Sequence, residues 1–432
     1  MYDEYVQCAF QHNARKLQQH NAIQRKLQAL LTRKVAMSTP STPHWFTGSE
    51  YTHKVAQAIA QYGPIARTTL AQMLGLSQGA LSRITSDLIY ANVIEEMTES
   101  SQHDSKLPAD YAPQENSRKR GRPQTALRLR AEERSFIGLN IHGSDVSITA
   151  TDALCRPLAQ CVTEHLESLE PADAVHHIAD LVKRYCSTLD TAPVSMGISF
   201  GGHAKDDRYV TFAPFLHWDG IVDLAGIVEE ESGLPCAIFN DLDSLLLHEG
   251  WFGAGVGLPR FAVITIGSGV GYSLSENGSP IDYPDKSYGL IGHIPVDPDG
   301  PRCYAGHIGC TQCLTNDSLA EEYSMMIGRQ ATFDEFAADA LAGSAQAKQL
   351  VNKVCFRLGA LIAVMANFAM PEHVIVSGES SFLANLNKES IRNGINWYRP
   401  SQASKVNFQI LDFYWSDWAE AAAARAIVRY IG

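Results

Sequence analysis

Apolar residues between positions 49 and 97 recur three or four positions apart, which is the spacing of amphipathic α-helices. The pattern predicts a first helix stopped by Gly63-Pro64, a second that begins with capping-box spacing at Thr69 and ends at Gly75, and a third capped by Ser77. The inward positions are, in chain order, Val55, Ile59, Tyr62, Leu70, Met73, Leu74, Leu81, Ile84 and Leu88. Three short helices with apolar sides predict a small helical domain over residues 49–97.

The outward side of the third predicted helix is polar. It carries Gln78, Ser82, Arg83 and Ser86, whose side chains suit hydrogen bonding to base edges in a major groove. Two helices joined by a Gly turn, the second with a polar outer face, are typical of a helix-turn-helix. The alternative is a three-helix bundle with a solvated polar face.

Residues 1–48 form a polar and basic extension. Ile23, Leu27, Leu30 and Leu31 fall at helical spacing among Arg and Lys residues, which predicts an amphipathic helix. It would serve as an oligomer contact or an extra DNA contact, and a dispensable extension is an equally good interpretation. Residues 38–43, Ser-Thr-Pro-Ser-Thr-Pro, are typical of a linker.

A polar insertion and a basic stretch follow over residues 98–130. Residues 98–117 are polar, whereas six of the thirteen residues from Arg118 to Arg130 are basic and none is acidic. The segment Arg118, Lys119, Arg120, Gly121 and Arg122 is flat and cationic enough to enter a narrow minor groove. The alternative is a solvated linker between domains.

From residue 136 the pattern changes to short apolar runs separated by amphipathic helices. Runs at 136–141 and 146–151 flank a Gly143-Ser144 turn and predict a hairpin. A helix is expected over 172–186, and strands over 194–200, 237–239, 262–266 and 373–377. Because several of these strands end in Gly or carboxylate loops, residues 131–432 are predicted to form an α/β domain with its site at strand ends.

Composition bounds these interpretations. A chain of 432 residues is too long for one compact core, so two or three domains are expected. The net charge of -12 argues against a protein that coats nucleic acid along its length, and it leaves room for the local basic stretches.

Nine scattered cysteines do not form a disulfide pattern and fit a reducing cytoplasm. No signal peptide and no apolar run long enough for a bilayer are expected, so no membrane insertion.

A Gly/Pro/Asp-rich loop from Gly289 to Cys313 concentrates metal-binding chemistry. His293, Cys303, Cys310 and Cys313 suit one tetrahedral Zn²⁺ per chain, which would add folding free energy to an otherwise irregular segment. His307 is a substitute ligand. The alternative is a loop with buried free thiols.

The same loop resembles the signature of the ROK family (repressors, open reading frames and sugar kinases), G-H-x6-G-x2-C-x-C-G-x2-G-C-x-E. Gly292-His293, Gly300, Cys303, Gly306, Gly309 and Cys310 match. Ala305 stands in place of the middle Cys and Gln312 in place of the final Glu. Residues 65–96 resemble the winged helix-turn-helix of ROK repressors, and Arg120-Gly121-Arg122-Pro123 resembles their wing element. Residues 134–432 resemble the ROK domain, which implies a multidomain chain whose C-terminal part has an actin/hexokinase-like, duplicated ribonuclease H-like α/β fold.

The resemblance allows the parts of a sugar kinase to be checked. Its Asn-Asp pair is present as Asn240-Asp241, and a Gly loop runs from Gly267 to Gly271. The first phosphate loop, however, carries Asn140 where the kinases have a carboxylate, and Asn has no charge to hold Mg²⁺. We therefore expect no kinase activity.

The sugar side also departs from the family pattern. Leu290 and Gln312 stand where sugar-binding members have Glu, and carboxylates are the strong acceptors for sugar hydroxyls. The remaining effector-binding candidates are Gly201, Gly202, Asn240, Asp241 and His293. The expected ligand is a sugar or phosphosugar, with another metabolite or no small molecule as alternatives.

Together these features predict a transcriptional regulator, a repressor of carbohydrate uptake or catabolism genes. It would bind palindromic double-stranded operator DNA as a homodimer or homotetramer in the cytoplasm, on the nucleoid when DNA-bound. The alternatives are a regulator controlled by a protein such as a transporter domain, a sugar kinase, and a DNA-binding structural protein without an effector.

Overall fold

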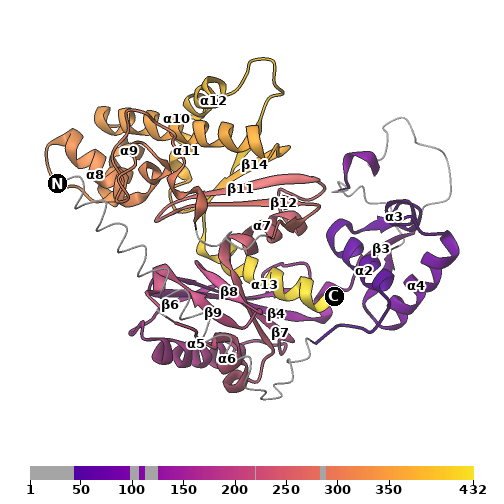
Figure 1. Ribbon diagram of the computed structural model, residues 1–432. Helices are drawn as coiled ribbons and strands as arrows, with labels where there is room; N and C mark the ends of the chain where they lie inside the picture. The colour runs from indigo at the N-terminus through magenta and orange to yellow at the C-terminus, as the bar shows by residue number, and fades with distance from the viewer. Residues whose placement is uncertain (1–42, 98–106, 112–124, 219, 283–288) are drawn as a thin grey trace, which may run out of the picture. The chain divides into compact units, whose positions relative to one another are not determined.

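The computed structural model describes residues 43–97, 107–111, 125–218, 220–282 and 289–432 (Figure 1). Four sets of predictions lie wholly or mostly outside these residues. They are the N-terminal amphipathic helix, the linker at 38–43, the polar insertion at 98–117 and the basic segment Arg118, Lys119, Arg120, Gly121 and Arg122.

The N-terminal part of the described chain contains three helices and a small sheet. The helices are α2 (Glu50–Tyr62), α3 (Arg67–Leu74) and α4 (Gln78–Tyr90). Strands β1 (Ile65–Ala66), β3 (Ala126–Leu129) and β2 (Ile94–Met97) form an antiparallel sheet in that order. We call these six elements the head.

Local sequence explains the helix ends of the head. Ser49 and Thr52 form a capping box at the start of α2, and Ser77 accepts a hydrogen bond from the backbone N–H of Ala80 at the start of α4. Gly75 adopts φ 63° between α3 and α4, a conformation that glycine enters without steric cost. The predicted start of α3 is wrong, because the helix begins at Arg67 and its N-cap, Ala66, provides no side-chain cap.

The first large sheet has five strands in the order β10-β7-β4-β5-β6. Their bounds are β4 (Ser135–His142), β5 (Asp145–Asp152), β6 (Val162–His165), β7 (Ser195–Phe200) and β10 (Cys236–Asn240). Strands β4, β5 and β6 are antiparallel, whereas β7 and β10 run parallel to β4. Helices α5 (Pro171–Cys186) and α6 (Leu224–Ser232) and the small hairpin β8 (His203–Lys205) and β9 (Tyr209–Phe212) complete this lobe.

The second large sheet repeats that arrangement in the order β13-β12-β11-β14-β15. Its strands are β11 (Arg260–Ile266), β12 (Val270–Glu276), β13 (Ser279–Pro280), β14 (His373–Ser377) and β15 (Asn407–Ile410). As in the first sheet, three strands are antiparallel and two run parallel to the central one. Two α/β lobes with the same strand order and directions therefore follow one another along the chain.

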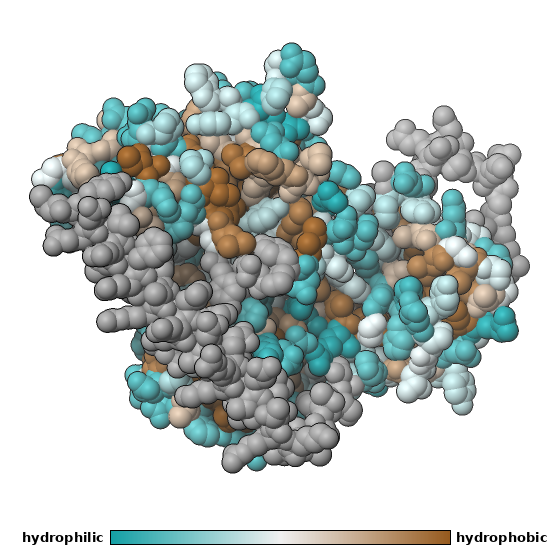
Figure 2. Space-filling view, in the orientation of Figure 1, coloured by the Kyte–Doolittle hydropathy of each residue, from teal (hydrophilic) through white to brown (hydrophobic). Residues whose placement is uncertain are grey.

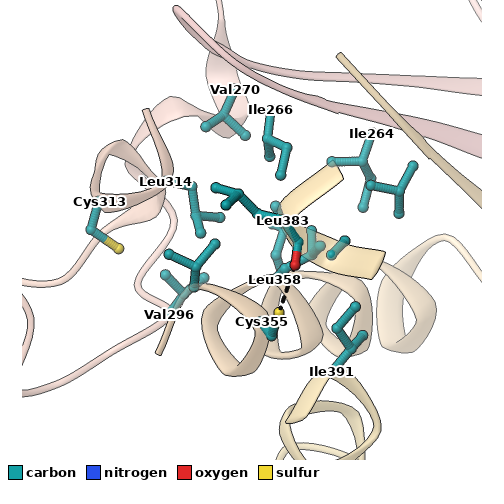
Figure 3. Packing of buried hydrophobic residues seen from close by; sticks show 14 of the residues in the cluster. Ile264, Ile266, Val270, Val296, Cys313, Leu314, Cys355, Leu358, Leu383 and Ile391 are labelled. Atoms are coloured by element: carbon teal, nitrogen blue, oxygen red, sulfur yellow. Dashed lines mark hydrogen bonds between the residues drawn. The ribbon is translucent and has the colours of Figure 1, made fainter. Parts of the chain in front are cut away.

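Helices α8 (Asn316–Ile327), α9 (Phe333–Ala342), α10 (Ala345–Phe368), α11 (Phe382–Leu386) and α12 (Lys388–Trp397) belong to the second lobe. Figure 3 shows part of its core, where Leu358 and Cys355 of α10 lie among Ile264, Leu383 and Ile391. The thiol of Cys355 donates to the carbonyl of Leu383 at 3.4 Å.

Helix α10 is long and apolar enough to cross a membrane by length and composition, which the sequence analysis did not anticipate. Its most apolar stretch is 72% buried inside the structure, as in the core helix of a folded domain. On the face of the molecule seen in Figure 2, hydrophilic residues are interspersed with apolar ones.

Helix α13 (Trp415–Ile431) packs on the first sheet with almost no space between the backbones. A Cβ atom on Gly138 of β4 would lie 1.9 Å from the carbonyl oxygen of Ala419, and one on Gly197 of β7 would lie 2.0 Å from that of Ala422. The two glycines are paired neighbours in the sheet. They therefore form a shallow track in which the Ala-rich face of α13 lies.

The last turn of α13 also holds the head. Its carbonyl groups accept hydrogen bonds from the backbone N–H of Trp45 (to Tyr430, 3.0 Å) and from Nε2 of Gln57 (to Gly432, 2.5 Å). The Nδ1 atom of His53 lies 2.7 Å from the carbonyl oxygen of Ile431. Buried residues of the head, α7 (Asp241–Trp251) and α13 form one continuous apolar cluster.

Candidate functional site

The loop between β13 and α8 brings together two imidazoles and two thiols. Ligand atoms of His293, Cys303, His307 and Cys310 all lie within 4.8 Å of one another. The Nδ1 atom of His293 is 3.6 Å from Sγ of Cys303 and 3.7 Å from Sγ of Cys310, and Nδ1 of His307 is 3.8 Å from Sγ of Cys303. Two nitrogen and two sulfur donors at this spacing fit a tetrahedral zinc ion after small adjustments.

The protonation state of His293 also suits a metal ligand. Partial burial and the nearby His307 both lower the pKa of His293, so its ring is neutral near pH 7. A neutral imidazole can offer a nitrogen lone pair to a metal ion. The group could therefore bind a metal without first losing a proton from this side chain.

Cys313, one of the four predicted ligands, lies elsewhere. It is on the short 3₁₀ helix Thr311–Leu314 and is buried in the core of the second lobe, where Figure 3 draws it near Leu314 and Val296. Burial raises the pKa of its thiol to about 12. The structure thus brings together three of the four predicted residues and adds His307.

A buried ion-pair network, which the sequence analysis missed, fixes this loop to the second lobe. The guanidinium of Arg357 on α10 donates to Asp297 of the loop at 2.8 Å and to Glu322 of α8 at 2.6 Å. Arg357 is only 1% exposed, so its buried charge depends on these two carboxylates, and removing both would leave it without compensation. No local sequence signal links residues 60 positions apart in the chain.

The effector-binding candidates of the first lobe do meet. Asn240 caps α7 and donates from Nδ2 to the carbonyl of Gly202 at 2.9 Å. Asp241 accepts a hydrogen bond at Oδ1 from the backbone N–H of Leu242, while its Oδ2 faces Gly201, where an added Cβ would lie 3.4 Å away. Burial raises the pKa of Asp241 to about 6. The described contacts of His293 are with the metal group and with Tyr304, whose hydroxyl lies 3.1 Å from Nε2 of His293.

Side chains at the first phosphate loop of the sequence pattern contact other parts of the chain. Asn140 is buried and donates to Oγ of Ser199 at 2.9 Å, and its Oδ1 has no hydrogen-bond partner among the described residues. The ring of His142, two residues on, stacks on Trp415 with centroids 3.5 Å apart.

The Gly267–Gly271 loop is likewise engaged by the chain itself. Oε2 of Glu379 accepts hydrogen bonds from the backbone N–H and hydroxyl of Ser268, at 3.1 and 2.9 Å, and from Nδ2 of Asn316 at 2.9 Å. A carboxylate therefore takes up donors that a phosphate group would need. Sequence reasoning did not single out Glu379, which lies 111 positions from Ser268.

The predicted DNA-reading residues lie together on α4. Gln78, Ser82, Arg83 and Ser86 are all exposed, while Leu81, Thr85 and Leu88 on the opposite side are buried. The hydroxyl of Ser86 donates to the carbonyl of Ser82, one turn earlier. Arg83 is exposed and has no hydrogen-bond or ion-pair partner among the described residues.

Comparison with known proteins places these features in context. The sequence profile described as "ROK family" matches residues 136–429. The chain is 24% identical to the DNA-binding transcriptional repressor Mlc of Escherichia coli K12 over 77% of its own length and 81% of that protein. It is 25% identical to the dual regulator NagC of the same strain over 75% and 79%. A glucokinase of Halalkalibacterium halodurans is 31% identical over 50% of this chain and 71% of the glucokinase.

Solved structures give the same fold. A ROK family transcriptional regulator, a homolog of the Escherichia coli MLC protein, superposes with a TM-score of 0.69 at 21% identity, covering 88% of this chain and 96% of that one. A ROK hexokinase from Thermus thermophilus superposes with a TM-score of 0.57 at 21% identity, covering 67% and 97%. The first of these similarities extends well beyond the residues matched by the family profile.

Proposed function

The chain belongs to the ROK family, and from this premise we propose that it is a transcriptional regulator, a repressor of carbohydrate uptake or catabolism genes that binds double-stranded operator DNA through its head. The observation that carries the proposal is the exposed face of α4, where Gln78, Ser82, Arg83 and Ser86 lie free of packing. Similarity to Mlc and NagC covers 75–77% of the chain, whereas the glucokinase similarity covers 50%.

The head would act as a winged helix-turn-helix. Helix α4 follows α3 after the left-handed Gly75 and would enter the major groove, while β2, β3 and the residues between them, 98–125, would form the wing. Arg118, Lys119, Arg120, Gly121 and Arg122 would then track the neighbouring minor groove. A homodimer or homotetramer would match the two-fold symmetry of a palindromic operator.

Catalysis of phosphoryl transfer is disfavoured by two features of the strand-end loops. Asn140 offers no charge for Mg²⁺, and Glu379 places a negative charge on the Gly loop where a nucleotide phosphate would bind. The protein is therefore proposed to have lost kinase activity. A coupled assay with ATP and hexoses would overturn this if it showed turnover that Asp241→Ala removes.

The metal group would hold one zinc ion through His293, Cys303, His307 and Cys310. In this set His307 replaces the thiol that is missing at Ala305. When bound, zinc would cross-link an irregular loop and add to its folding free energy. Independently of zinc, the ion pair between Arg357 and Asp297 holds this loop against the second lobe.

Control by a small effector is proposed at Gly201, Gly202, Asn240 and Asp241, between the two lobes. An effector that binds one lobe arrangement better than the other would shift the population of head positions. The coupling free energy by which the effector changes operator affinity is the one by which the operator changes effector affinity. His293 would link this site to the metal loop. The alternative effector is a protein partner such as a transporter domain.

Operator selection tests the proposal. The full-length protein is incubated with fragmented genomic DNA, retained fragments are sequenced, and the recovered site is used in competition assays at fixed salt. Arg83→Ala is expected to weaken specific binding by about tenfold or more, with little effect on nonspecific binding, because a base contact carries about 1–3 kcal/mol of discrimination. Arg329→Ala, at an exposed Arg paired with Glu335 in the second lobe, is the matched control.

Two results would contradict this proposal. Recovery of no enriched site would reject sequence-specific DNA binding. Equal loss of specific and nonspecific affinity in Arg83→Ala would show that Arg83 contacts phosphate rather than a base edge.

A further inference from the structure

We infer that Phe215 is a ligand-contacting, specificity-determining residue of the proposed effector site, and that it selects a neutral pyranose bearing an apolar substituent over a sugar phosphate. The inference rests on the proposed effector control and names the ligand class at that site. It depends on where the ring of Phe215 lies, how it is held and which charges surround it.

The ring is presented to solvent by an anchored turn. Phe215 is in the 3₁₀ helix Pro214–Leu216 and is 51% exposed, yet Leu216 and Trp218 nearby are 2% and 3% exposed. Nε1 of Trp218 donates to the carbonyl of Leu169 at 2.8 Å. His217 adopts φ 54°, a conformation that costs energy for a non-glycine residue. An exposed aromatic ring beside two buried anchors is held in place rather than loosely solvated.

The ring lies between glycine loops of the two lobes. A Cβ atom on Gly201, just after β7, would lie 2.9 Å from Cδ2 of Phe215, and one on Gly269, just after β11, would lie 3.4 Å from Cζ. The same position on Gly201 would be 3.4 Å from Oδ2 of Asp241. One edge of Phe215 therefore rests on the first lobe beside a carboxylate, and its tip reaches the second lobe.

This combination has a definite ligand preference. An aromatic face packs against the C–H face of a pyranose or against a ring-bearing substituent, while a carboxylate accepts hydrogen bonds from hydroxyl groups. Two carboxylates lie beside the glycine loops that Phe215 approaches: Oδ2 of Asp241 near Gly201, and Glu379, which accepts hydrogen bonds from Ser268 next to Gly269. Negative charge beside both loops disfavours a phosphate group there.

The two positions where sugar-binding members of the family have Glu supply few hydrogen bonds to hydroxyl groups. Gln312 donates its Nε2 to the carbonyl of Gly292 at 3.0 Å, and Leu290 is an exposed apolar residue. Recognition must then rely more on apolar contact with Phe215 than on hydroxyl hydrogen bonds. A glycoside with an aromatic aglycone satisfies that requirement better than a free hexose.

Isothermal titration calorimetry on the full-length protein tests the inference. The probes are the methyl and phenyl β-D-pyranosides of glucose and galactose, together with glucose 6-phosphate. We expect at least one phenyl glycoside to bind about tenfold more tightly than its methyl counterpart and than glucose 6-phosphate. Phe215→Leu, which keeps the apolar bulk, should remove that advantage, and Phe215→Tyr should retain it. Phe368→Ala, at a ring 82% exposed on α10, should change nothing.

Three outcomes overturn the inference: no pyranoside binds the wild type, glucose 6-phosphate binds best, or Phe215→Leu keeps the preference for the phenyl aglycone. Operator binding by the wild type and by Phe215→Leu is measured in parallel without sugar. Absence of operator binding in the wild type would reject the proposed regulator, whereas intact operator binding with failed sugar binding would reject the role of Phe215 alone.

Discussion

The imidazole of His307 completes a donor set that is one thiol short. Ala305 offers no ligand atom, and Cys313 is buried among apolar residues, so the fourth position falls to a ring whose Nδ1 lies 3.8 Å from Sγ of Cys303. A His/Cys substitution changes the bond lengths and charge of a zinc site while keeping its tetrahedral geometry.

We predict that His307→Ala lowers the zinc content of the purified protein from about one per chain to well below half. Adding Ala305→Cys in the same chain should restore it, because a thiol returns to the loop near the same point. Zinc is measured by mass spectrometry after dialysis against a chelator. Cys313→Ser is the control and should keep its zinc; loss of metal in that variant would return Cys313 to the ligand set.

At the scale of single residues, the sequence identified the metal-binding residue types better than it identified which residues contact one another. The loop spacing singled out His293, Cys303 and Cys310, all of which meet. It also favoured Cys313 over His307, because spacing does not reveal that a short 3₁₀ helix turns Cys313 into the core. Glu379 and Arg357 act on residues far away in the chain, and such pairs leave no local signal.

Among the elements, α13 depends on two glycines of the first sheet. Gly138 and Gly197 leave room for the carbonyl oxygens of Ala419 and Ala422, at distances where a Cβ atom would overlap with them. Because the obstacle is backbone, a larger residue could be accommodated only by lifting the helix away from the sheet.

We predict that Gly197→Ala destabilises the protein by about 3 kcal/mol, seen as a melting temperature lower by several degrees in calorimetry. Gly79→Ala is the matched control, because Gly79 lies in helix α4 with open space around its Cα. Replacing a helical glycine by alanine there should be neutral or stabilise by about 0.5–1 kcal/mol. Equal melting temperatures for the two variants would contradict the packing argument.

The predicted elements that proved correct are those with strong apolar patterns. The expected helix over 172–186 is α5, and the expected runs at 136–141, 146–151 and 373–377 correspond to β4, β5 and β14. Strand β12 (Val270–Glu276) was missed, although Val270, Tyr272 and Leu274 alternate with small residues, because its start overlaps the Gly loop from Gly267 to Gly271. Edge strand β6 is mostly exposed and shows no apolar run.

For the molecule as a whole, the attachment of the head matters most. Helix α2 donates side-chain hydrogen bonds to α13 and α7, from Gln57 to Gly432 and from Gln61 to Gly250 at 2.8 Å, and His53 lies against Ile431. These contacts connect the head, which is proposed to bind DNA, to the helix that lies across the first lobe. A displacement of the last turn of α13 would therefore alter its contacts with α2.

We predict that replacing His53, Gln57 and Gln61 together by Ala loosens this attachment. Amide hydrogen exchange should accelerate by about tenfold in α2 and in the last turn of α13, since each lost hydrogen bond contributes about 0.5–1.5 kcal/mol. The second lobe should be unaffected. Lys54→Ala, which removes an exposed ion pair with Glu50 and a cation–π contact with Tyr51 on the same helix but no contact with α13, is the control and should leave exchange unchanged.

The sequence pattern indicated a helical head and an α/β body, and the resemblance to the ROK family implied the duplication that the two matching strand orders display. The sequence could not show that Trp45 and His53 contact the last turn of α13, because nearly four hundred positions separate these residues from that turn. Contacts of such long sequence separation arise only when both partners have folded.

The apolar cluster shared by the head, α7 and α13 also determines how this chain can be divided into fragments. Trp251, Ile427 and Ile431 are buried in a layer to which Val55, Ile59 and other residues of the head contribute. A shortened chain that begins after the head would expose that apolar layer to water and would tend to aggregate. Useful fragments must therefore carry polar replacements in this layer, or keep the head and replace the residues of α4 that are proposed to bind DNA.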